Sequence, residues 1–135
     1  MPLKDIVYDR YKENPACKRV QVAFRVAGDS LVPSEITKLL KVEPTRIVTQ
    51  PWGVWSISSD AFIDSKSTAK HVRYILDKIE PMKQSIATLI EDEEYDVSFS
   101  IWWEADDRTG GYRLSRDELI RLSALCNYID FFFIG

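Results

Sequence analysis

The sequence contains few of the residues that build most catalytic and metal sites. It has one histidine and two cysteines among 135 residues. Cys17 and Cys126 lie far apart, so they lack the close spacing of zinc and redox pairs, and two cysteines do not make a disulfide scaffold. We therefore expect a protein of a reducing, cytoplasmic compartment that holds no metal and no cofactor.

The motifs of common enzyme classes are also missing. The sequence has no glycine-rich phosphate loop, no pair of histidines at metalloprotease spacing and no EF-hand loop. Gly110 and Gly111 are followed by tyrosine and arginine rather than by a helix start, which indicates a turn. His71 has no nucleophile or orienting acid beside it, so we predict a surface residue on a helix and assign no catalytic residue.

Basic charge and long apolar runs are scarce as well. Lysine and arginine number 18 against 21 acidic residues, a net charge of −3, which argues against a protein that binds nucleic-acid phosphates. No apolar run approaches the ~20 residues of a membrane span. The one strong charge run, residues 91–94, is acidic, and it indicates either a solvated helix end or a patch for a basic partner.

The composition that remains is that of a globular domain. The chain is 45% hydrophobic and 29% charged, and its sixteen aromatic residues (six Phe, six Tyr and four Trp) supply large rings for a core. The first eighteen residues are polar and irregular. We therefore predict an N-terminal arm over 1–18 and a single α+β domain over 19–135.

Alternating patterns predict the strands. Residues 19–27 place Val20, Val22, Phe24 and Val26 on one side, and residues 95–105 place Val97, Phe99, Ile101 and Trp103 on one side. Residues 45–49 and 54–59 flank a proline and a glycine, which favours a hairpin. Residues 128–134 are very apolar, which predicts a strand that is buried on both faces or covered on its outer face.

Spacings of three and four predict the helices. Pro33 begins a short helix over 33–41, and an apolar stripe runs from Val72 to Ile90 in constant phase across Pro81, which indicates one bent helix or two nearly collinear ones. Ser115 and Glu118 form a capping box before a helix with an apolar face at Leu119, Leu122, Leu125 and Cys126.

These elements together predict an α+β fold. We expect a mixed, mainly antiparallel sheet with helices packed on one face, in a ferredoxin-like βαββαβ core with an appended αβ unit. The other face of the sheet would then be partly open.

Aromatic residues beside arginine are the best candidates for a binding site. Alternation sends Trp103 into the core and Trp102 to the opposite face, where Arg25 also points. The candidate binding residues are Arg25, Trp52, Trp55, Trp102 and Tyr128. The alternative is that the N-terminal arm or a second subunit covers this face, or that these rings only fill the core.

The sequence also resembles the bacterial family known as domain of unknown function 4279. The resemblance is carried by the first strand with Gly28 and Asp29, by the Gly53-x-Trp55 segment, and by the following stretches: 31–40, 42–45, 76–81, 114–119 and 128–134. Val32 departs from the pattern, because an acidic helix cap is expected there. The resemblance implies a small α+β protein and assigns it no activity.

Three functions remain open at this point. The leading hypothesis is a non-enzymatic protein-binding protein, such as an immunity protein that neutralises a basic toxin, because an acidic surface steers a basic partner. The first alternative is a small-molecule-sensing or regulatory module that pairs with itself through the open sheet face. The second alternative, an enzyme of unknown class, has the least support.

Overall fold

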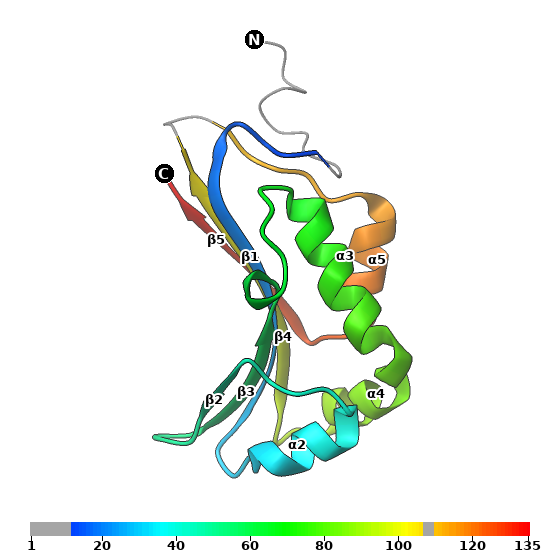
Figure 1. The fold of residues 1–135 in the computed structure, drawn as a ribbon. Helices are drawn as coiled ribbons and strands as arrows, with labels where there is room; N and C mark the ends of the chain where they lie inside the picture. Colours follow the sequence, from blue (N-terminus) through cyan, green and yellow to red (C-terminus); the bar gives the residue numbers. More distant parts are fainter. Residues whose placement is uncertain (1–11, 107–109) are drawn as a thin grey trace.

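The computed structural model describes residues 12–106 and 110–135, which build a five-stranded sheet with a layer of helices against one face (Figure 1). The elements in chain order are β1 (Cys17–Gly28), α2 (Pro33–Leu40), β2 (Arg46–Val48), β3 (Gly53–Ser58), η1 (Ser59–Ala61), α3 (Thr68–Ile79), η2 (Glu80–Met82), α4 (Lys83–Glu91), β4 (Asp96–Ala105), α5 (Arg116–Ser123) and β5 (Tyr128–Ile134). No helix in the described part of the chain is both long and apolar enough to cross a membrane.

The strands lie in the order β2-β3-β1-β4-β5. The pairs β2–β3, β3–β1 and β1–β4 are antiparallel, and β5 joins β4 in parallel after α5. The first four strands and their helices form the ferredoxin-like βαββαβ core, and α5 with β5 is the appended αβ unit. The predicted fold class is confirmed.

The core lies between the helices and the two central strands. Phe24 of β1 pairs directly with Phe99 of β4, and their rings lie 5.2 Å apart between centroids. The inward residues of both strands are those that alternation predicts, and all are at most 2% exposed: Val20, Val22, Phe24, Val26, Val97, Phe99, Ile101 and Trp103. Burial of one row of side chains on each strand is what fixes the register of these pairs.

Prolines mark two helix boundaries. Pro33 occupies the first turn of α2, where a missing N–H costs nothing, and Val32 before it provides no side-chain cap. Pro81 lies in the single 3₁₀ turn η2 between α3 and α4, because a proline ring does not fit the interior of a helix. The chain turns at η2, and α4 runs in a different direction from α3 (Figure 1).

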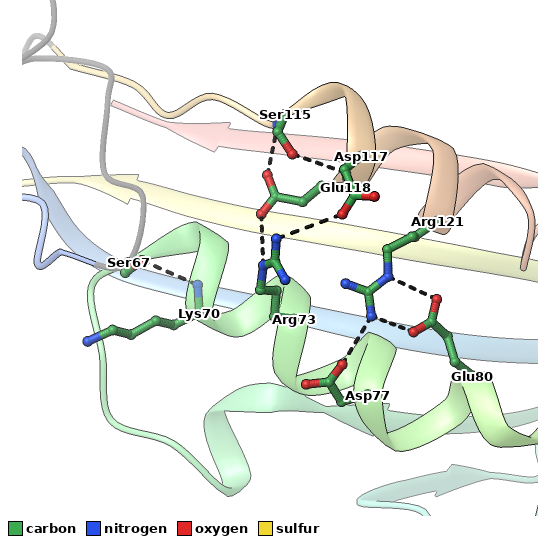
Figure 2. Close-up of polar contacts among 9 residues, drawn as sticks. All are labelled: Ser67, Lys70, Arg73, Asp77, Glu80, Ser115, Asp117, Glu118 and Arg121. Atoms are coloured by element: carbon green, nitrogen blue, oxygen red, sulfur yellow. Dashed lines mark hydrogen bonds and ion pairs between the residues drawn. The ribbon is translucent and has the colours of Figure 1, made fainter.

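Polar contacts hold α5 against α3 (Figure 2). Arg121 donates from Nε to Glu80 at 2.9 Å and from a terminal nitrogen to Asp77 at 3.0 Å, and a second bond to Glu80 makes that pair bidentate. The hydrogen bonds from Arg121 lower the pKa of the Glu80 carboxyl. The capping box is present as predicted: Ser115 accepts from the N–H of Glu118, whose carboxylate accepts from the N–H of Ser115.

The expectations about burial in α5 and β5 are wrong. Leu119 is 42% exposed, because α5 turns Leu122 and Leu125 toward the core instead. The described residues leave most of β5 uncovered: Tyr128 and residues 131–134 are all exposed, whereas Ile129 is half-buried against the core. The physical reason is that β5 lies at the edge of the sheet, where β4 is its one described neighbour. The described helices do not cover β5 enough to bury its side chains.

Candidate functional site

The open face of the sheet, opposite the helices, carries two of the candidate residues. Arg25 lies on it, in a hollow of about 370 Å³ whose lining also includes Arg46 of β2. The rest of the lining is small or polar: Gln21, Ala23, Thr45, Val48, Val54, Ser56, Ser58 and Ser100. We call this feature the arginine hollow. Within the described residues neither arginine forms an ion pair, and no acidic side chain contributes to the lining.

Trp102 lies on the same open face but near β5. Its ring contacts Phe132 at 6.0 Å between centroids, and its indole N–H donates to Glu104 at 3.1 Å. Glu104 also pairs with Arg19 at 3.2 Å. Trp102 is therefore a partly buried ring that packs against the edge strand, and it does not line the arginine hollow.

Trp55 belongs to the core and is separate from this face. It is 0% exposed, its ring meets Phe24 edge-on at 6.4 Å, and its N–H donates to the Thr37 hydroxyl at 3.0 Å. No surface of this side chain is available to a partner. The inclusion of Trp55 among the binding residues is corrected here: it sits on the helix-covered face, where alternation also places Ile57.

The other two candidate residues meet at one end of the sheet. Trp52 and Tyr128, which are 50% and 60% exposed, line a cavity of about 620 Å³ where β1 ends and β3, β4 and β5 begin. Five carboxylates share its lining, and no described lysine or arginine does: Asp29, Asp92, Glu93, Glu94 and Asp96. We call this feature the acidic–aromatic cavity.

Local geometry explains why the acidic loop lies against the sheet. The Asp92 side chain accepts from the N–H of Glu94 at 3.0 Å, and the Asp92 carbonyl accepts from Tyr95 at 3.0 Å, which closes a tight turn. Gly28 lets this turn approach β1, since a Cβ there would lie 2.7 Å from the Glu94 carbonyl oxygen. Asn127 links the turn's strand to β5 through two bonds with the Val97 backbone.

The chemistry of this cavity suits a cation. Exposed carboxylates attract ammonium and guanidinium groups, and the faces of Trp52 and Tyr128 offer cation–π contacts worth about 0.5–2 kcal/mol each. Within the described residues no group of three or more His, Cys, Asp or Glu side chains is arranged to hold a metal ion. An organic cation, such as a basic side chain of a partner, is the better match.

His71 is not the surface residue that the sequence predicts. It is 1% exposed: Nδ1 lies 2.5 Å from the Ser59 hydroxyl, and Nε2 lies 2.7 Å from the Ser65 carbonyl. Ser59 is itself 0% exposed and also accepts from the N–H of Val22 at 2.9 Å. Burial lowers the pKa of His71. The sequence did contain a sign of this burial. His71 lies four residues before buried Ile75, so the two side chains lie on the same face of the helix.

Cys17 is buried and Cys126 is half-buried, and neither is an activated thiol. Cys17 is 0% exposed, and burial raises the pKa of Cys126 to about 11, which keeps it a thiol at neutral pH. Two surface features therefore contain candidate binding residues: the arginine hollow and the acidic–aromatic cavity.

Comparison with known protein families identifies the domain. A family model described as Domain of unknown function (DUF4279) matches residues 52–132. The chain belongs to the DUF4279 family. The DUF4279 match begins at Trp52 and includes Trp102, Tyr128 and the loop from Asp92 to Asp96, whereas Arg25 and Asp29 lie outside it. No curated protein and no solved structure matches this chain.

Proposed function

We propose that this protein is a non-enzymatic binding protein whose acidic–aromatic cavity receives basic side chains of a protein partner. The observation that carries the proposal is the lining of that cavity. Five acidic residues and two residues with exposed aromatic rings line one space of about 620 Å³, with no described basic residue among them. A surface of this kind fits a lysine- or arginine-rich protein.

Long-range charge adds to this local fit. The chain carries a net charge of −3, so a basic partner is attracted before contact and its association is accelerated at low salt. A basic nuclease toxin has the required chemistry. Neutralisation of such a toxin, as an immunity protein, is our more specific proposal.

The buried imidazole–hydroxyl pair favours binding over catalysis. His71 and Ser59 are the pair that hydrolytic chemistry would use, but both lie in the core and line neither the acidic–aromatic cavity nor the arginine hollow. Their hydrogen bonds are instead directed to the backbone of β1 and of the loop before α3.

Binding of a fluorescent nona-arginine peptide tests the cavity. We expect the double variant Glu93→Gln/Glu94→Gln to raise the dissociation constant about tenfold at low salt, because two of the five carboxylates lose their charge. Trp52→Ala should raise it several-fold through loss of the cation–π contact. The matched control Glu35→Gln/Glu43→Gln removes the same charge from exposed positions elsewhere.

An equal loss in the control pair would show that the peptide responds only to net charge, and it would refute the cavity as the site. Purification of the chain from its host, with a basic toxin domain retained by the native protein and lost from Glu93→Gln/Glu94→Gln, would support the more specific proposal. Retention of that domain by both proteins would contradict it.

The arginine hollow supports a second candidate function, a module that senses a small anion. Arg25 and Arg46 offer two guanidinium groups over a floor of hydroxyls, in an otherwise acidic protein. We expect millimolar citrate to raise the melting temperature of the native protein by several degrees, and Arg25→Gln/Arg46→Gln to abolish the rise. The single variant Arg116→Gln, at an exposed position on α5, is the control. No shift in the native protein would dispose of this candidate.

A further inference from the structure

The free edge of β5 carries a run of exposed apolar side chains. This strand is last in the order of the sheet, so one side of its backbone pairs with β4 and no strand of the described residues lies along the other side. Its large side chains are 41–60% exposed: Tyr128, Phe131, Phe132, Phe133 and Ile134. The end of the sheet that carries the C-terminal part of β5 leans away from α3 and α5 (Figure 1).

This edge carries none of the usual protections against pairing. Edge strands are normally short, bulged, or blocked by lysine or proline. β5 is seven residues long and pairs with β4 in an unbroken register from Tyr128 to Ile134. It contains no lysine and no proline, and Asp130 is its one charged residue. An edge of this kind is a template for another strand.

We propose that the partner of this edge is β5 of a second copy of the chain, in an antiparallel pair that joins two sheets into one of ten strands. A two-fold axis at Phe131 places Phe131 opposite its own copy and Asp130 opposite Phe132 of the other copy. The two Asp130 carboxylates then do not face each other, so the pair contains no opposed like charges. The same register pairs Tyr128 with Ile134 and Ile129 with Phe133.

The faces of the two sheets also match in this arrangement. Ile129, Phe131 and Phe133 share a face with Phe99, Ile101 and Trp103, toward the helices, and Tyr128, Asp130 and Phe132 share the open face. Each pair across the two-fold axis joins residues of the same face. The helix layers of both copies therefore lie on one side, and on that side Phe131 meets its own copy while Ile129 meets Phe133.

The area available is sufficient for a dimer. With about 200 Å² per aromatic ring, four rings exposed by roughly half supply about 400–450 Å² per protomer, and Ile134 adds to this. Two protomers together bury roughly 1,000 Å², the lower bound of a specific interface. The new backbone hydrogen bonds across the edge add directionality that a flat apolar patch lacks.

The mass of the native protein in solution, without peptide or partner, tests this inference. Sedimentation or light scattering at micromolar concentration should give twice the mass of one chain. Phe131→Glu should raise the dimer dissociation constant about 100-fold or more, because the two-fold axis places two carboxylates together in the apolar interface. Ile120→Glu is the matched control, since Ile120 on α5 has the same 55% exposure as Phe131.

Circular dichroism and a thermal melt show whether each variant is folded. A second variant, Phe132→Lys, places a lysine on the same edge strand but on the open face of the sheet. This lysine should block strand pairing, so the variant should also be a folded monomer. A native chain that is monomeric would overturn the inference, and so would one that dimerises only after residues 1–11 are removed. A dimer that survives Phe131→Glu, or that Ile120→Glu breaks equally, would overturn it too. None of these results depends on peptide binding at the acidic–aromatic cavity.

Discussion

Replacement of Trp55 by alanine is expected to lower the free energy of unfolding by about 3–5 kcal/mol, the usual cost of an indole-sized cavity in a core. Small domains have about 5–15 kcal/mol of stability in total. The variant should therefore unfold at much lower denaturant concentration, as chemical denaturation followed by circular dichroism will show. The reason is that Trp55 is fully buried, packs against Phe24 and donates to Thr37.

Two further substitutions separate volume from hydrogen bonding at this position. Thr37→Val leaves the indole N–H without its acceptor at nearly constant volume, and should cost about 1–3 kcal/mol. Trp52→Ala removes a half-exposed ring and should change stability by no more than about 0.5 kcal/mol. A destabilising Trp52→Ala together with a neutral Trp55→Ala would reverse the assignment of these two rings to surface and core.

Replacement of His71 by leucine is expected to cost about 2–4 kcal/mol at pH 7.5, because the Ser59 O–H loses its acceptor and the Ser65 carbonyl loses its donor. At pH 7.5 the imidazole is neutral, because burial lowers its pKa. The Ser65 carbonyl can only accept, so the Nε2–H donates to it and Nδ1 accepts from the Ser59 hydroxyl. Leucine satisfies neither the hydroxyl nor the carbonyl. Denaturation curves of the variant and the native chain measure the difference.

The same network makes the native protein less stable at mildly acidic pH. Burial lowers the folded pKa of His71 below its unfolded value near 6.5, so the unfolded chain takes up the proton first. The free energy of unfolding should be constant above about pH 7 and fall as the pH drops through 6.5 toward the folded pKa. His71 is the single histidine of the chain, so the His71→Leu variant should lack this slope.

A native protein whose stability between pH 7 and 5 is flat would contradict a neutral, buried His71. So would a His71→Leu variant with the same slope as the native chain. Titration of Glu80 does not contribute to the change in stability between pH 7 and 5. Its pKa is lowered by Arg121, so its contribution to stability is lost only at pH values below 4.5.

Local pattern was sufficient for most of the fold. Alternation in β1 and β4 predicts their buried residues because one face of each strand packs on the helices. Pro33, Pro81 and the Ser115 capping box predict helix boundaries because each acts within one turn of the chain. These are short-range effects, and a single sequence contains them.

The candidate site was only partly accessible to such reasoning. Trp52 and Tyr128 stood out as aromatic, and residues 91–94 stood out as acidic, but nothing local joined them. Asp29 follows β1, whereas Trp52, Asp96 and Tyr128 lie at the starts of other strands. With the antiparallel directions of those strands, the positions fall at the same end of the sheet. The sequence therefore places these residues together only after the order of the strands in the sheet is assumed.

The sequence by itself determined the buried rows of β1 and β4, the helix boundaries at Pro33 and Ser115, and the α+β class of the fold, because these follow from periodicity and local chain stiffness. Only the tertiary structure decided that β5 lies at an edge with its phenylalanines exposed, that His71 is buried against Ser59, and that five carboxylates share one cavity with two aromatic rings. Strand order and the meeting of distant segments depend on long-range packing, which the spacing of residues along one chain does not record.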